Sequence, residues 1–386
     1  MAAEVTLDLE GWYEFKAQHL SSGQRAPVLV EDQVIQWMAE LMRLPSQSSG
    51  ILLASVGVAN ILGLAVARYA GCGFDVRKYG LYGGTRRLTV YGTTEAGVWG
   101  RKGLELLGLG SDSWRDITTR DFRMDTTRLH RQIALDRRAG LQPLCVIGTA
   151  GSAGTGASDD LNAIAQICCD EGIWLHVDGA FGALAQWSER LRGRVAGIER
   201  ADSVAFDLQK WSHQPFAIAC LLVRDGQIHR NANASGLPFV DLGVEPNRDF
   251  RAFEVWMSLK TQGVRVITSV MEQNVDQALY FASLISAHPQ LELVASIELN
   301  IVCFRYVPGG CANQPLLNSL NEELLLRLQE QGNKTLSSIV LDGRFALRCT
   351  FSSRRARSED TSQLAAEVAR AGAQLANERL PWSRID

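Results

Sequence analysis

Two side chains of contrasting chemistry, the carboxylate of Asp178 and the amine of Lys210, each follow a short apolar segment of the chain. These segments, residues 173–177 and 203–206, have the length and apolar content of buried parallel strands. In open α/β sheets, ligands bind beyond the carboxyl ends of the strands. The sequence therefore predicts that an acid and a lysine are brought to one edge of a sheet.

An acid and a lysine at such an edge suit the chemistry of pyridoxal phosphate (PLP). A lysine amine forms a Schiff base with a carbonyl cofactor, and a carboxylate facing the pyridine nitrogen keeps that nitrogen protonated. Only six of the 39 lysine and arginine residues are lysines, and Lys210 stands between Gln209 and Trp211, where a surface charge is poorly explained. A structural ion pair between Asp178 and Lys210 is the alternative, and the residue types alone leave it open.

The elements that must position these residues follow the order strand, glycine loop, helix, strand. Residues 144–147 form an expected strand, and the nine residues that follow, 148–156, contain four glycines. Such a loop must turn sharply or approach another group closely. Ser158 or Asp159 is expected to cap the next helix. This order is the βαβ signature of a parallel sheet.

A turn of small residues at Ala54-Ser55-Val56-Gly57 precedes an apolar helix that is expected to reach about Tyr69. The first backbone N–H groups of a helix have no partner within it, so a helix start binds phosphate well. Most such turns are plain helix starts, and that alternative stays open.

The composition is that of an ordinary globular protein, with 46% apolar residues, 21% charged residues and a net charge of −3. No block of basic residues predicts binding to nucleic acid or to an anionic membrane. The longest apolar run, residues 51–67, is interrupted by polar residues and is shorter than the ~20 residues that a membrane span needs. Eight scattered cysteines predict neither disulfides nor a metal site and favour a cytoplasmic location.

The length predicts one large and one smaller domain. We expect an N-terminal helical segment at residues 1–45, a PLP-binding large domain at 46–287 and a small α+β C-terminal domain at 288–386. Within the large domain, residues 225–248 are rich in asparagine, glycine and proline and predict a long surface loop.

Six segments, in this order, resemble the group II PLP-dependent decarboxylases, the superfamily of the aromatic-L-amino-acid and glutamate decarboxylases. They include Thr149-Ala-Gly-Ser-Ala-Gly-Thr-Gly156, Trp174-Leu-His-Val-Asp-Gly-Ala-Phe-Gly182 and Asp207-Leu-Gln-Lys-Trp211, followed by residues 243–248, 255–260 and 299–306. The resemblance extends from about residue 31 to residue 360. It implies an α/β, aspartate-aminotransferase-like fold (PLP fold type I), whose large domain has a mostly parallel sheet, and a homodimer with its active site at the subunit interface.

The resemblance also implies roles for individual residues. Lys210 would hold PLP as a Schiff base and move protons at the substrate's α-carbon, and Asp178 would pair with the ring nitrogen. The implied cofactor-binding positions are Ser55, Val56, Gly57, Trp99, Thr149, Asp178, Ala180, Asp207, Gln209 and Lys210. No metal is implied.

Several positions depart from the family's pattern. Gly97 stands where a ring-stacking histidine is usual, and Trp99 could stack instead, although an indole cannot act as an acid or base near neutral pH. Gln209 replaces another histidine. The loop at residues 225–248 has no tyrosine to act as a proton donor; His229 is its one histidine, and a solvated loop residue is the alternative to a catalytic one.

The expected function is α-decarboxylation of an L-amino acid through a Lys210 Schiff base and a quinonoid. The departures keep two alternatives open: a decarboxylation-dependent aldehyde synthase or another PLP lyase or transferase, and a non-catalytic dimer that binds PLP. Arg348, on a strand of the small domain, is a weaker candidate for pairing with a substrate carboxylate.

Overall fold

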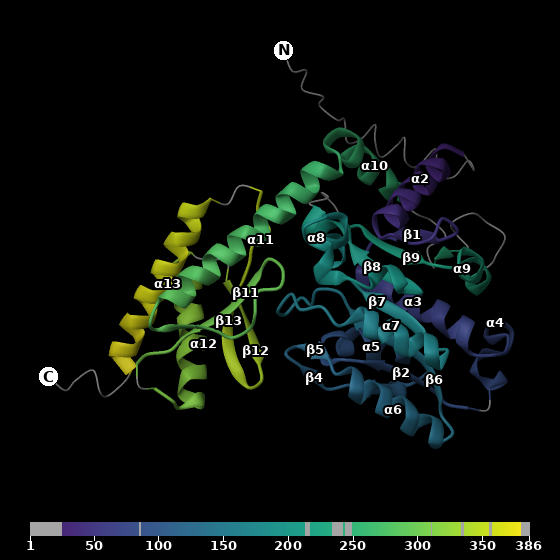
Figure 1. The fold of residues 1–386 in the computed structure, drawn as a ribbon, viewed down its shortest axis with the longest axis horizontal. Helices are drawn as coiled ribbons and strands as arrows, with labels where there is room; N and C mark the ends of the chain where they lie inside the picture. The colour runs from purple at the N-terminus through teal and green to yellow at the C-terminus, as the bar shows by residue number, and fades with distance from the viewer. Residues whose placement is uncertain are drawn as a thin grey trace, which may run out of the picture.

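The structure, a computed structural model, describes residues 25–84, 86–212, 217–233, 242–243, 249–309, 311–332, 336–354 and 357–379. Residues 1–24 of the predicted N-terminal segment therefore lie outside the described residues. The same holds for residues 234–241 and 244–248 of the predicted loop, which include most of the matched segment 243–248. Figure 1 shows two units, and the long helix α11 (Val264–Ala287) runs from one to the other.

The larger unit is built on a seven-stranded sheet with the strand order β1-β9-β8-β7-β6-β2-β3. The strands are β1 (Ser49–Leu53), β2 (Leu88–Gly92), β3 (Trp114–Asp116), β6 (Gln142–Thr149), β7 (Trp174–Asp178), β8 (Ser203–Asp207) and β9 (Ala219–Val223). The five strands from β8 to β3 are parallel, whereas β9 is antiparallel to both of its neighbours. Apart from β3, most side chains of these strands are apolar and buried, as expected for a sheet covered by helices and loops.

Helices surround this sheet, and α3 packs against the strands from β6 to β9. The helices of the larger unit are α2 (Arg25–Leu41), α3 (Val56–Gly71), α4 (Val76–Tyr79), α5 (Thr94–Leu106), α6 (Thr126–Arg138), α7 (Leu161–Glu171), α8 (Leu208–Ser212), α9 (Gly226–Asn233) and α10 (Arg251–Gln262). The short 3-10 segments are η1 (Gly80–Gly83), η2 (Ser111–Ser113), η3 (Ala183–Trp187), η4 (Arg192–Val195) and η5 (Ile198–Arg200), and a small hairpin pairs β4 (Thr119–Arg120) with β5 (Arg123–Met124). No single described helix is long and apolar enough to cross a membrane, and the one pair that passes together, Val56–Gly71 with Val76–Gly83, is bent by 107°.

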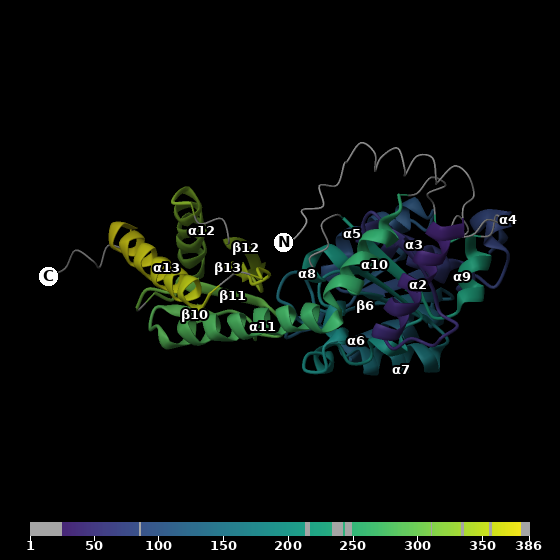
Figure 2. The same ribbon diagram turned by 90° about the horizontal axis from the view of Figure 1, so that it is seen from above.

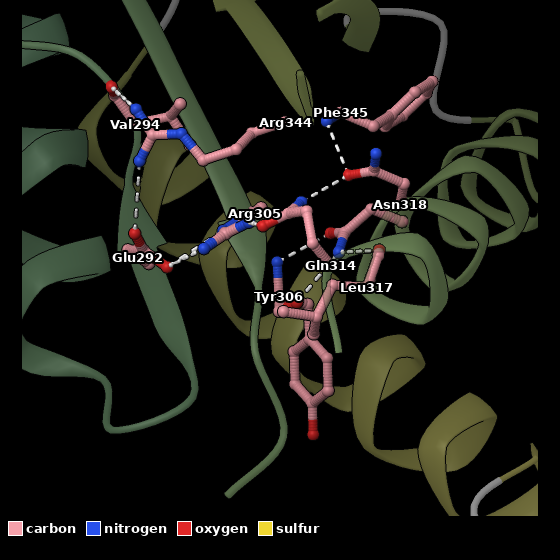
Figure 3. Close-up of polar contacts among 10 residues, drawn as sticks. Glu292, Val294, Arg305, Tyr306, Gln314, Leu317, Asn318, Arg344 and Phe345 are labelled. Atoms are coloured by element: carbon pink, nitrogen blue, oxygen red, sulfur yellow. Dashed lines mark hydrogen bonds and ion pairs between the residues drawn. The ribbon is translucent and has the colours of Figure 1, made fainter. Parts of the chain in front are cut away.

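The smaller unit has a four-stranded antiparallel sheet with the order β10-β11-β13-β12. Its strands are β10 (Leu291–Leu293), β11 (Ile301–Tyr306), β12 (Leu336–Leu341) and β13 (Arg344–Thr350), and its helices are α12 (Gln314–Glu330) and α13 (Ser358–Arg379). Figure 2 shows α11, α12 and α13 gathered about these strands. A polar network ties the sheet edge to α12: buried Arg305 pairs with Glu292 at 2.8 Å and bonds Gln314 at 3.0 Å (Figure 3).

Two expectations about local structure were wrong. The segment 225–248 does not begin as a loop, because α9 occupies Gly226–Asn233 after Asp225 accepts hydrogen bonds from its first N–H groups. The cap of α7 is Asp160, whose carboxylate accepts from Ala163 N–H at 3.0 Å. Asp159 turns inward instead, and that orientation matters for the site described next.

Candidate active site

The carboxyl ends of three parallel strands bring the predicted residues together. Thr149 ends β6, and it pairs in register with Asp178, which ends β7. Asp178 in turn pairs with Ala205 of β8, two residues before that strand ends at Asp207. The five-residue helix α8 follows directly and carries Lys210. The acid and the lysine therefore lie at the same edge of the sheet, as the sequence predicts.

Asp178 is held by donors from three other residues. Its Oδ1 accepts from Ala180 N–H at 3.0 Å and its Oδ2 accepts from the Trp99 indole N–H at 2.7 Å, while the Asn60 side chain supplies a further hydrogen bond. Burial raises the pKa of Asp178 above its ordinary value, and these hydrogen bonds and the positive charge of Lys210 oppose that rise. Every one of these neighbours favours the ionised carboxylate.

A chain of hydrogen bonds leads from Asp178 to the other end of β7. His176 Nε2 lies 2.9 Å from Asn60 Oδ1, and His176 Nδ1 lies 2.8 Å from Ser203 Oγ. Because only the amide nitrogen of Asn60 can donate to Asp178, its Oδ1 must accept, and His176 therefore carries its proton on Nε2. Burial lowers the pKa of His176 to about 3, so the ring is neutral and its Nδ1 accepts from the Ser203 hydroxyl. Trp174 Nε1 completes the chain by donating to Ser203 Oγ at 2.8 Å.

Lys210 is more open than the groups beneath it. Its side chain is 38% exposed, and its ammonium lies 3.9 Å from Asp207 Oδ2. Asp207 also accepts from Gln209 N–H at 2.8 Å, so this acid caps the short lysine-bearing helix while facing the lysine. Gln209 itself is exposed. Because the 3.9 Å contact is longer than a hydrogen bond and the amine reaches solvent, Lys210 remains available to form a covalent bond.

The start of α3 has the geometry of an anion site. Ser55 has an extended backbone and caps the helix, and its hydroxyl accepts from Gly57 N–H at 3.2 Å. Ser55 is exposed, and Val56 and Gly57 are half-buried. Leu53, which ends β1 just before this turn, is in register with Ala219 and through it with Asp207. The start of α3 therefore lies at the same end of the sheet as Asp178 and Lys210, and its free N–H groups and dipole favour a phosphate.

The side chain of Thr149 has a buried polar atom that makes no hydrogen bond within the described part of the chain. Its backbone N–H donates to Asp159 Oδ2 at 2.8 Å, but its Oγ1 is buried and has no hydrogen-bond partner among the described residues. Burial raises the pKa of Asp159 to about 6, even though this carboxyl also accepts from Met124 N–H. An orphaned hydroxyl beside Asp178 is the kind of group that a bound ligand satisfies.

The glycine-rich loop after β6 owes its composition to close packing. Gly151 has a φ of +71°, and a Cβ there would come within 2.6 Å of the backbone of Gly182. Near Gly154 the loop meets Glu95 of α5. Burial raises the pKa of Glu95, against hydrogen bonds from Gly154 and Ser152 and the charge of Arg348. The loop and Glu95 thus close one side of the site.

Arg348 and His229 lie in other settings than those considered from the sequence. Arg348 Nε donates to the carbonyl of Gly154 at 3.1 Å, which ties β13 to the glycine loop. His229 is fully buried, 2.7 Å from Ser49 Oγ. Ser49 stands in register with Ser203 across β9, at the end of the sheet opposite Asp207. His229 is therefore neither a loop proton donor nor a solvated loop residue, and both readings are wrong.

Sequence reasoning missed Asn60, His176 and Ser203, which support Asp178, and Glu95 beside the loop. One signal could have found His176: it is two residues before Asp178, and alternate strand residues share a face. Asn60 is five residues after Ser55, and the other residues of that helix up to Ala67 are apolar, which is a second signal. No group of three His, Cys, Asp or Glu side chains in the described part of the chain is placed to hold a metal.

These residues fit PLP. Asp178 suits the ring nitrogen, and the orphaned Thr149 hydroxyl suits a ring substituent. The start of α3 suits the phosphate, and Lys210 suits the aldehyde. Trp99 and Ala180 lie against Asp178, through the hydrogen bonds given above. Whether Trp99 stacks on the cofactor ring stays a prediction.

Comparison with known proteins assigns the family. Residues 22–307 match the model of the pyridoxal-dependent decarboxylase conserved domain. An aromatic-L-amino-acid decarboxylase of Bacillus atrophaeus is 29% identical over 354 residues, which cover 88% of this chain and 72% of that protein. A 4-hydroxyphenylacetaldehyde synthase of Rhodiola rosea is 26% identical over 359 residues, 86% of this chain and 70% of that protein.

Solved structures agree with this assignment. The crystal structure of mouse CSAD in its apo form has a TM-score of 0.84 and 26% identity, and the match covers 90% of this chain and 76% of that one. The tryptophan decarboxylase (TDC) of Oryza sativa with PLP and tryptamine, at 24% identity, has a TM-score of 0.86 and covers 95% of this chain and 81% of that one, which supports the fold. The predicted α/β fold of the aspartate-aminotransferase type is confirmed. The chain belongs to the pyridoxal-dependent decarboxylase family and is a PLP-dependent carboxy-lyase of amino acids.

Proposed function

We propose that this enzyme removes the α-carboxylate of an aromatic L-amino acid, with Lys210 as the residue that binds PLP covalently. The observation that carries the proposal is the placement of Lys210 and Asp178 at the ends of neighbouring parallel strands, with the charge of one acting on the other. PLP, when bound, supplies an aldehyde that joins an amine and a ring that accepts electrons as CO2 leaves.

Each residue of the chain has a separate task. Asp178 would face the ring nitrogen and hold its proton, because an ionised carboxylate with several donors is an acceptor only. Thr149 would donate its free hydroxyl to the ring, and the start of α3 at Ser55 would take the phosphate. Lys210, whose amine reaches solvent, would move a proton at the α-carbon once the substrate's amine has taken its place.

The substrate class rests on the relatives. Besides the aromatic-L-amino-acid decarboxylase, a tryptophan decarboxylase of rice is 29% identical and a tyrosine decarboxylase of Petroselinum crispum is 26% identical. A histidine decarboxylase of mouse is 28% identical, although the match spans only 52% of that protein. All four names denote ring-bearing amino acids.

An aldehyde product is the second candidate, and one observation favours it. All seven tyrosines lie at or before Tyr91 or at or after Tyr280, so the segment 225–248 has none to return a proton to the α-carbon. Two phenylacetaldehyde synthases are 24% and 27% identical to this chain. Oxygen as co-substrate would then yield aldehyde, ammonia and peroxide in place of an amine.

A homodimer and a cytoplasmic location complete the proposal. Ser55, Gln209 and Lys210 are exposed in the single chain, which suits a site completed by a second subunit. All eight cysteines are free thiols, and seven are buried. A reducing compartment maintains cysteines in that form.

The test incubates the purified enzyme and PLP with each amino acid and assays CO2, amine, aldehyde and peroxide. Lys210→Ala is expected to lose turnover by at least about 10³-fold and to lose the PLP that borohydride fixes to the protein. Lys260→Ala, a lysine that packs on Trp37 and Trp256 outside the site, is the matched control and should retain both. Retention of borohydride-fixed PLP by Lys210→Ala would refute the assignment, and amine or aldehyde would decide between the two products.

A further inference from the structure

The indole N–H of Trp99 is committed to Asp178, the residue assigned to the cofactor's ring nitrogen. α5 carries Trp99 and β7 ends on Asp178, so the 2.7 Å bond joins a helix to a strand end. The same indole meets His176 edge-on, with 6.1 Å between ring centroids. Trp99 is therefore held against the hydrogen-bond chain that supports Asp178, and its one donor points at the carboxylate.

Asp178 still has room for one more donor. A carboxylate offers about four lone-pair sites on its two oxygens. Ala180 N–H, Trp99 N–H and the Asn60 amide take three of them. One site is left for a pyridine N–H, so Trp99 can keep its bond when the cofactor is present.

We infer that Trp99 is a positioning residue: its indole N–H fixes the Asp178 carboxylate and shares its negative charge, so that the ring nitrogen of PLP faces a weaker proton acceptor. The inference rests on the proposed function, because it takes Asp178 as the partner of that nitrogen. Donors to an anion stabilise the charged form and so make it a weaker base. Gly97 lies two residues before Trp99 in α5, at the position where the resemblance expects a histidine.

Other titratable groups also face Asp178. Lys210 acts on it from α8, Glu95 from α5, and His176 reaches it through Asn60. None of the three is itself substituted when Trp99 is changed, and phenylalanine keeps an aromatic ring beside His176. Trp99→Phe removes the N–H, keeps an aromatic ring and alters no charge, so its effect reports the hydrogen bond.

The chain offers a matched control. Trp114 Nε1 donates to Asp116 Oδ1 over the same 2.7 Å, but from β3 at the far edge of the sheet. Trp114→Phe therefore removes an indole–carboxylate bond of the same length outside the site, although Asp116 is more exposed and also pairs with Arg101. Asp178→Asn tests the premise, since an amide holds the ring proton much less firmly than a carboxylate.

The experiment follows the ring nitrogen of ¹⁵N-labelled PLP by NMR in the holoenzyme across a pH series. Trp99→Phe should raise the apparent pKa of that nitrogen by about one unit, a tenfold change in the proton equilibrium, because one hydrogen bond to the anion is lost. Trp114→Phe should leave the titration at the wild-type position. Identical titrations of Trp99→Phe and wild type overturn the inference.

The two proposals fail in different ways. If Asp178→Asn leaves the ¹⁵N signal unchanged, Asp178 is not the partner of the ring and the proposed placement fails. If Asp178→Asn moves the signal and Trp99→Phe does not, only the role of Trp99 fails. Should Trp99→Phe not fold, 3-benzothienylalanine at position 99 keeps the shape of the indole without its N–H, and the same comparison applies.

Discussion

Thr149 pairs in register with Asp178 at the ends of β6 and β7, and its hydroxyl is buried without a hydrogen-bond partner among the described residues. An unpaired buried hydroxyl destabilises a fold by about 1–3 kcal/mol. Such a cost is tolerated where a ligand supplies the partner, so we expect Thr149 to link the stability of the chain to cofactor binding.

Thr149→Val should therefore stabilise the cofactor-free protein by about 1 kcal/mol and weaken PLP binding about 5–10-fold, since valine has the same shape and no hydroxyl. Urea unfolding and PLP titration measure the two effects. Thr350→Val is the control, because Thr350 Oγ1 is also buried without a partner among the described residues but lies on β13 of the small unit. It should gain stability and leave PLP affinity unchanged. Unchanged affinity in Thr149→Val would contradict the role.

His176 should make the fold sensitive to acid. Burial lowers the pKa of His176 to about 3, whereas an unfolded histidine titrates near about 6.5. Between these two pKa values, the unfolded state binds a proton at His176 and the folded state does not. The stability that neutral His176 contributes is complete above about pH 6.5 and falls by at most about 1.4 kcal/mol per pH unit as the pH drops toward 3.

Unfolding free energies of wild type and His176→Gln between about pH 7 and pH 5 test this, because glutamine can donate and accept but does not titrate in that range. The stability advantage of the wild type should shrink as the pH falls. A constant difference would show that His176 is not held neutral.

Gly63 makes room for His176. A Cβ at position 63 would lie 2.5 Å from His176 Cε1 and 2.7 Å from Nδ1. Gly63→Ala should therefore cost about 1–3 kcal/mol of stability by overpacking and should also weaken PLP binding, since His176 holds Asn60 and Asn60 holds Asp178. Gly193→Ala, where the added methyl meets nothing within 4 Å, should change neither. Thermal unfolding and PLP titration give both readouts, and normal PLP affinity in Gly63→Ala would break the proposed link.

We expect Arg348 to stabilise the contact between the two units. Its guanidinium donates to the Gly154 carbonyl and lies 3.2 Å from Ser337 Oγ. Arg348→Gln is expected to lose about 1–2 kcal/mol of stability, because the charged guanidinium no longer donates to the loop carbonyl. The substrate KM should stay within about threefold, since the lost bond holds the loop and not the substrate. A KM that rises tenfold or more at unchanged stability would restore the alternative, a pairing with the substrate's carboxylate.

Much of the architecture could be predicted from patterns that local physics dictates. The apolar helix expected to reach about Tyr69 matches α3, and the strands expected at 144–147 and 203–206 lie within β6 and β8, because apolar residues mark the buried parts of these elements. Where polar side chains found other partners, prediction failed: Asp159 faces inward to Thr149, and Asp160 takes the capping role. Both were equally good caps by residue type.

The sequence by itself determined the chemistry at the edge of the sheet, since an acid and a lysine at the ends of neighbouring strands must share that edge. Only the tertiary structure decided what surrounds them. It removed His229 to the opposite end of the sheet, and it aimed the Trp99 N–H and the Asn60 amide at Asp178 from two different helices. The positions of strands and helices follow from local patterns, but the direction of a donor depends on how helices far apart in the chain pack, and no spacing in the sequence records that.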